Sequence, residues 1–106
     1  MNAAELELRK LVELELEAAN RENPPFHSAH EGYAVILEEA DEAQAELEAL
    51  LAWVRELWED IKMNAGKARN FTAGIEYRAL RLAAEALQVA AMARKFQQLG
   101  GKRDDA

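Results

Sequence analysis

The sequence predicts an all-α protein whose protomer has three helices, with long second and third helices. Two observations lead to this prediction. Apolar residues recur at helical spacing over long stretches, and the chain is rich in Ala, Leu and Glu while only 7% of its residues are aromatic, which is typical of long helices. The two prolines are adjacent and separate the first periodic stretch from the second.

A chain of 106 residues is expected to form one domain with a thin hydrophobic core. We place this domain at residues 1–101 and expect the charged tail 102–106 to be disordered. The apolar stripes are wider than one chain of this size can cover. We therefore expect a helical bundle that is completed by oligomerisation, as a homodimer or a homotetramer.

The first helix is predicted over Ala3–Asn20. Asn2 with Glu5 three residues later is a plausible N-terminal capping pair. The alternation of apolar and acidic residues over 5–16 would by itself suit a strand. The Glu, Leu and Ala content favours a helix instead, and so does the spacing of the apolar residues Leu8, Leu11, Val12 and Leu16.

The second helix is predicted after a linker, Asn20–His27, in which the paired prolines keep the chain extended. Ser28 and Glu31 form a capping box at its start. We allow for a kink or a short break near Ala52–Arg55. The apolar positions that follow helical spacing are Tyr33, Ile36, Leu37, Ala40, Ala43, Leu47, Leu50, Leu51, Val54, Leu57, Trp58 and Ile61.

The third helix is predicted to follow a loop at Asn64–Asn70, which contains Gly66. It begins near Asn70–Thr72, continues to Leu99, and stops at the pair Gly100-Gly101. Its middle is smooth because it carries many alanines, which let helices approach closely. These alanines are Ala79, Ala83, Ala84, Ala86, Ala90, Ala91 and Ala93.

Charge and composition exclude several classes of protein. The net charge of −7 argues against a nucleic-acid partner, because binding to phosphates requires cationic side chains. No cysteine is present, so disulfides and thiolate metal sites are excluded. Acidic residues interrupt the first 21 residues, which argues against a secretory signal. The apolar runs are far shorter than the roughly 20 residues that span a membrane. We expect a soluble, cytoplasmic protein without a membrane partner.

Carboxylates on two helices are the candidates for chemistry. Glu38, Glu39 and Glu42 lie on adjacent turns of the second helix, and Glu39 and Glu42 share one face. Oxygen ligands of this kind suit Mg²⁺, and acids from a second helix complete such sites in helical bundles. Glu85 and Gln88, again three residues apart, are the strongly polar residues in the middle of the third helix. The alternative is that all of these side chains lie on solvated faces. On the third helix, such a face is indicated by a polar stripe at helical spacing: Arg78, Arg81, Glu85, Gln88 and Lys95.

Other side chains have simpler interpretations. His27 and His30 are three residues apart but lack a metal-binding pattern, so a capping or surface role is favoured. Trp53 and Trp58 lie in an apolar stripe and are interpreted as core residues rather than as platforms for a nucleotide base.

Two segments resemble one known superfamily. The stretch Phe26–Glu42, FHSAHEGYAVILEEADE, and the later Glu85–Met92, EALQVAAM, resemble the MazG-like, all-α nucleoside triphosphate pyrophosphohydrolases. The resemblance is strongest to the short members that phages and prophages carry. It covers about Pro25–Phe96, most of the chain, although its motifs are short and made of common residues.

The family pattern is ExxE on one helix, often preceded by another Glu, and ExxD on the next. Glu38, Glu39 and Glu42 match the first half, including the additional Glu. Glu85 matches the start of the second half, but Gln88 stands where the family has Asp. An amide oxygen can ligate a metal ion but brings no charge, so it holds the ion less tightly than a carboxylate does.

The resemblance implies a dimer or tetramer that hydrolyses a nucleoside triphosphate to the monophosphate and pyrophosphate. Mg²⁺, with Mn²⁺ as a possible substitute, is expected to bridge the triphosphate to Glu39, Glu42 and Glu85, with Gln88 as a further ligand. Glu38 is expected to position or deprotonate the attacking water. The basic residues that are candidates to meet phosphate oxygens, or alternatively to pair with the surplus glutamates, are Lys62, Lys67, Arg78 and Arg81.

Two alternatives to an enzyme remain open. The first is a nucleotide-binding or phage accessory protein of the same fold, in which Gln88 marks lost catalysis. The second is a purely structural helical oligomer, in which the acids are solvated.

Overall fold

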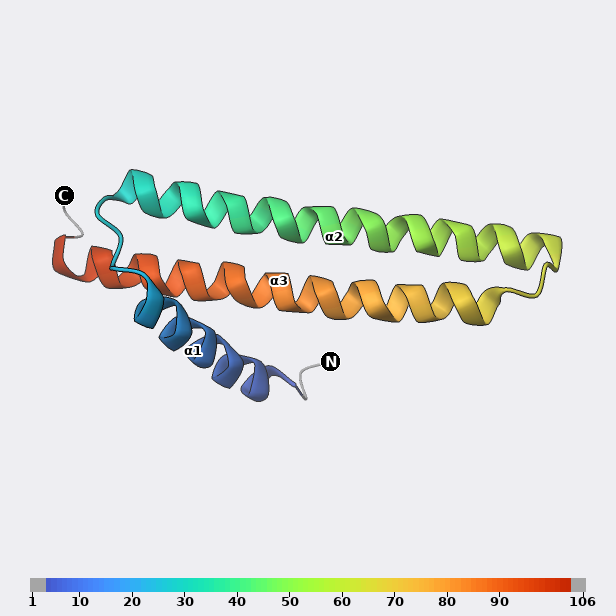
Figure 1. Cartoon of the computed structure of the whole chain (residues 1–106), viewed down its shortest axis with the longest axis horizontal. Coiled ribbons are helices and arrows are strands. Elements are labelled where there is room, and N and C mark those ends of the chain that lie inside the picture. The colour runs from blue at the N-terminus through green and yellow to red at the C-terminus, as the bar shows by residue number, and fades with distance from the viewer. Residues whose placement is uncertain (1–3, 104–106) are drawn as a thin grey trace. The chain divides into compact units, whose positions relative to one another are not determined.

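The computed structural model describes residues 4–103 and confirms the all-α prediction. It has three helices, α1 (Glu5–Glu22), α2 (Ala29–Met63) and α3 (Ala68–Arg103), joined by two short connections (Figure 1). No helix within these described residues is long and apolar enough to cross a membrane.

Helix α1 is shifted by two residues toward the C-terminus from its prediction, Ala3–Asn20. The predicted capping residue Asn2 lies outside the described residues. The N-cap is Ala4, which offers no side-chain hydrogen bond, and the acids Glu5 and Glu7 in the first turn stabilise the positive end of the helix dipole.

Helix α2 begins with the predicted capping box. The backbone N–H of Glu31 donates to the hydroxyl of Ser28 at 3.1 Å, and the Glu31 carboxylate accepts from the backbone N–H of His27 at 2.5 Å. Helix α2 then continues without the break that was allowed near Ala52–Arg55, because each turn keeps apolar residues at helical spacing.

The connection between α2 and α3 is shorter than predicted. Asn64 and Gly66 have positive φ angles of 52° and 81°, conformations that suit Asn and Gly. The buried carboxylate of Asp60 accepts from the backbone N–H of Lys67 at 3.0 and 3.2 Å, just before α3 begins at Ala68. This side chain supplies the cap that the local sequence pattern did not show.

Helix α3 continues to Arg103, beyond the predicted stop at Gly100-Gly101. Glycine lowers helix propensity by about 1 kcal/mol without forbidding a helix. The first two residues of the predicted disordered tail therefore lie in α3, and residues 104–106 lie outside the described residues.

The chain divides into two compact units. Unit 1 combines Met1–Ala40 with Ala86–Ala106, and unit 2 is Asp41–Glu85. The division into two compact units does not decide whether residues 1–101 form a single domain, so that statement stays a prediction.

Unit 1 contains the hydrophobic core. The buried apolar side chains come from α1, from the linker and from α3, so this core joins both ends of the chain. A Cβ at Gly32 would lie 2.4 Å from the Phe96 ring, so a side chain there would displace that ring. The core residues are Leu16, Phe26, Ala91 and Met92, packed against Val12, Ala19, Val35, Ile36, Phe96 and Leu99.

Unit 2 is a hairpin of the C-terminal part of α2 and the N-terminal part of α3 (Figure 1). Trp53 packs against Phe71 with a ring-centroid distance of 5.7 Å, and a Cβ at Gly74 would lie 2.6 Å from the Trp53 ring. Trp53 therefore packs between the helices, as interpreted, whereas Trp58 is exposed. Among the described residues of this unit, the buried side chain is the polar Asp60, and no apolar side chain is buried.

Candidate functional site

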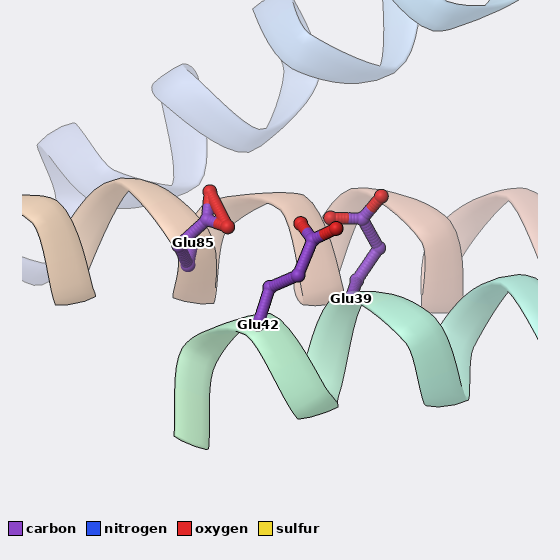
Figure 2. A group of neighbouring side chains, drawn as sticks. All are labelled: Glu39, Glu42 and Glu85. Atoms are coloured by element: carbon purple, nitrogen blue, oxygen red, sulfur yellow. The ribbon is translucent and has the colours of Figure 1, made fainter. Parts of the chain in front are cut away.

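Helix geometry places Glu39 and Glu42 on one face of α2, one turn apart. An oxygen atom of Glu42 lies within 4.8 Å of an oxygen of Glu39 and of an oxygen of Glu85, which is on α3. Figure 2 shows these three carboxylates as neighbouring side chains. Three of the predicted metal ligands are thus neighbours in the structure.

The carboxyl group of Glu85 has a raised pKa. Burial is the largest cause, followed by a side-chain hydrogen bond with Glu42 and by the negative charge of Glu42. Arg81 opposes these effects and lowers the pKa of Glu85, whereas Glu46 raises it. Burial and the negative charge of Glu42 therefore both disfavour the ionised form of Glu85.

The basic residues predicted to meet phosphate are mostly engaged within the chain. Glu46, whose side chain is only 14% exposed, accepts from Arg78 at 3.3 Å and from Arg81 at 3.4 Å. Lys62 pairs with Glu59 at 2.9 Å, and its ammonium group lies 5.5 Å from the centroid of a Trp58 ring. Pairing with glutamates, the alternative weighed for these cations, is what the structure shows for Arg78, Arg81 and Lys62.

Lys67 is placed differently from the other predicted phosphate ligands. Its backbone N–H is held by Asp60, and the residue lies in the exposed connection between α2 and α3. This contact gives its main chain a structural role at the start of α3.

Gln88, the residue that departs from the family pattern, donates from its side-chain amide to the carboxylate of Glu15 on α1. Gln88 and Glu15 are both half-buried and both belong to unit 1. Glu38, the predicted catalytic base, is exposed one turn before Glu42. The structure thus brings Glu39, Glu42 and Glu85 together, gives Gln88 a partner on α1 and leaves Glu38 exposed to solvent.

Unit 1 also encloses a cavity of about 340 Å³. All three helices and the proline linker contribute to its wall, and its lining mixes apolar side chains with two carboxamides, two carboxylates and one ammonium group. The lining residues are Ala19, Asn23, Pro24, Phe26, Glu31, Val35, Glu39, Gln88, Met92 and Lys95.

Lys95 is the residue that sequence reasoning missed. It was grouped with a solvated stripe of α3, but it is only 5% exposed, and its ammonium group lies 4.8 Å from the centroid of the Phe26 ring. Lysine is almost never buried without a compensating contact. The signal was its position three residues after Met92, on the side of α3 that forms the core of unit 1.

The histidines have no place in this site. His27 is exposed, with its Nδ1 atom 3.6 Å from Glu31, and its backbone takes part in the capping of α2. His30 is exposed in the first turn of α2. Both placements agree with the capping and surface roles favoured for them.

The three carboxylates have two chemical possibilities. Grouped carboxylate oxygens suit a hard divalent cation such as Mg²⁺, but exposed acids also gather without any metal ion. Without a cation, the raised pKa of Glu85 reflects its burial and the negative charge of Glu42.

Comparison with known proteins gives no identification. No family model, no curated protein and no solved structure matches the chain.

Proposed function

We propose that the protein is a Mg²⁺-dependent nucleoside triphosphate pyrophosphohydrolase. The observation that supports this proposal is the grouping of Glu39, Glu42 and Glu85 from two helices, since these residues carry the resemblance to the MazG-like family. We propose a cytoplasmic setting, where nucleoside triphosphates are abundant.

The reaction is a hydrolysis. A water oxygen attacks the α-phosphorus, the bond from that phosphorus to the bridging oxygen breaks, and pyrophosphate leaves. Glu38, exposed one turn before Glu42, accepts the proton of the attacking water. Glu39, Glu42 and Glu85 would hold Mg²⁺, which would supply positive charge that stabilises the phosphate oxygens.

The cavity of unit 1 is the proposed seat of the nucleoside. Its volume of about 340 Å³ is near the lower end of the roughly 300–1,000 Å³ of small-molecule sites. Phe26 and Met92 offer an apolar wall for a base, and the amide groups of Asn23 and Gln88 offer hydrogen bonds to its edge. Glu39 lines this cavity and is also a member of the carboxylate group.

A second candidate function is nucleotide binding without turnover. It is favoured by Gln88, which carries no charge and whose amide donates to Glu15. A site with one carboxylate fewer than the family pattern binds divalent cations less strongly. In that case the protein is a sequestering or accessory factor.

The test is pyrophosphate release from a panel of nucleoside and deoxynucleoside triphosphates, with Mg²⁺ or Mn²⁺. We expect metal-dependent release that Glu42→Gln and Glu85→Gln each lower by at least about a hundredfold, as the loss of a group acting in the transition state does. The matched control is Glu56→Gln, an exposed carboxylate on α2 outside the group, which should leave the rate unchanged.

Two outcomes contradict the proposal. If Glu42→Gln is as active as Glu56→Gln, the carboxylate group is not the catalytic site. If the folded protein releases no pyrophosphate from any substrate but binds nucleotides, the second candidate replaces the first.

A further inference from the structure

Helix α2 carries an exposed apolar seam within unit 2. Its members follow one another at alternating intervals of four and three residues, and each is at least 40% exposed. We call these residues the open seam: Leu47, Leu51, Val54, Trp58 and Ile61.

The open seam runs beside a second seam that is already covered. Leu50, Trp53 and Leu57, each one position before a member of the open seam, are half-buried, and Trp53 contacts α3. A helix with two such seams is expected to have a neighbour on each. In unit 2, α3 covers only one of them.

The spacing defines what kind of neighbour fits. Intervals of four and three residues form the a and d positions of a heptad, which pack against a helix that carries the same pattern. Leu, Val, Trp and Ile at these positions offer large side chains to fill the space between two helices. Because no apolar side chain is buried in the described part of unit 2, a helix on the open seam would also supply this unit with a core.

The charges that flank the open seam define the partner and its direction. Asp41, Glu48, Arg55 and Lys62 are seven residues apart, each is exposed, and they follow the open seam on the same side. The first two are acidic and the last two are basic. A second copy of α2 running antiparallel places each acid opposite a base, whereas a parallel copy places the acidic half beside the acidic half.

We propose that a second copy of this chain docks on the open seam, with the two α2 helices antiparallel across a two-fold axis. Leu51 then lies opposite Val54 of the second copy, and Leu47 lies opposite its Trp58. Glu48 pairs with Arg55 of the second copy, and Asp41 with its Lys62. The Lys62–Glu59 pair within one chain is exposed and contributes little stability. Lys62 can therefore leave Glu59 and pair with Asp41 of the second copy. The interface follows from unit 2 alone and does not depend on the proposed catalytic activity.

The first test uses matched substitutions on two exposed leucines. Leu51→Glu places a charge in the open seam, and Leu80→Glu places one on α3, where Leu80 is 65% exposed. Sedimentation velocity should find two chains per particle for the wild type and for Leu80→Glu, and one for Leu51→Glu. Circular dichroism should show that the helices remain in all three proteins.

The second test reverses the flanking charges. Glu48→Arg and Arg55→Glu each replace two symmetric attractions by two repulsions, and each should raise the dimer dissociation constant by about tenfold. The double variant restores opposite charges across the interface, and its dissociation constant should return close to that of the wild type. A different protein partner would not produce this reciprocal rescue.

Three results would overturn the inference. A wild type that stays monomeric at high concentration shows that no second copy binds. Equal dissociation by Leu51→Glu and Leu80→Glu shows that the open seam is not the interface. A double charge variant that stays as weak as the single variants shows that the helices do not pair antiparallel in this register.

Discussion

The helices of unit 1 and the helices of unit 2 are held together by different kinds of contact. Unit 1 buries four apolar side chains from three segments, Leu16, Phe26, Ala91 and Met92. Unit 2 is held by ring contacts around Trp53 and by polar contacts of Asp60 and Glu46. Apolar burial is the larger source of free energy, at about 25 cal/mol per Å². Unit 1 therefore owes its stability mainly to its own core, whereas unit 2 leaves large apolar side chains exposed to solvent.

The largest expected effect comes from removing part of the core of unit 1. Leu16→Ala should lower the free energy of unfolding by about 3 kcal/mol, since it loses buried methyl groups and leaves a cavity. Leu14→Ala, on the same helix but 59% exposed, should change it by less than about 0.5 kcal/mol. Urea unfolding at one protein concentration measures both. Similar losses in the two variants would show that α1 is not held by the core of unit 1.

A smaller effect is expected from the buried polar group of unit 2. Asp60→Ala removes the acceptor of the Lys67 backbone N–H and should cost about 1–2 kcal/mol, the usual loss for a helix cap. The neighbouring Glu59→Ala, which removes only an exposed ion pair, should cost less than about 1 kcal/mol. If Glu59→Ala proves the more destabilising variant, the cap at Asp60 does not hold the hairpin.

The smallest expected effect concerns Glu85 and depends on pH. Because the folded protein raises the pKa of Glu85 above its ordinary 4.5, the stability linked to its protonation is fully present below pH 4.5 and is lost as the pH rises through the raised value. Glu85→Gln cannot lose a proton, so it should be slightly more stable than the wild type at pH 7 and equal to it near pH 4.

Thermal unfolding at both pH values, without divalent cations, measures this difference. Glu76→Gln, an exposed position on α3 of the same unit, is the control and should not show the same dependence on pH. A Glu85→Gln variant that is less stable than the wild type at pH 7 would contradict the repulsion between Glu42 and Glu85.

Local patterns in the sequence predicted the helices well. The apolar spacing gave all three helices, and the Ser28–Glu31 pair gave the start of α2. The helix ends were less accurate where the deciding contact is not local. The start of α3 depends on Asp60, seven residues before Lys67 in the sequence, and the two glycines predicted to stop α3 lie inside it.

The candidate site was predicted only in part for a similar reason. Spacing along one helix placed Glu39 beside Glu42. Glu85 was a candidate because it is strongly polar in the middle of the third helix, and the family resemblance then gave it the role of a metal ligand. Neither pattern shows which residues of α1 approach α3, so the contact of Gln88 with Glu15 was not expected. Burial of Lys95 was missed because a lysine in a polar stripe is ordinarily solvated.

The division of the chain has a consequence for the order in which the protein folds. Unit 2 is one continuous segment, and its polar contacts span 7, 32 and 35 residues of sequence. Unit 1 joins both ends, and its contacts Gln88–Glu15 and Arg94–Glu13 span 73 and 81 residues. Closing a longer loop costs more entropy and slows folding. During synthesis on a ribosome, all residues of unit 2 are present before the part of α3 that packs against α1 has been made. Unit 1, which has the larger apolar core, is therefore expected to form after unit 2.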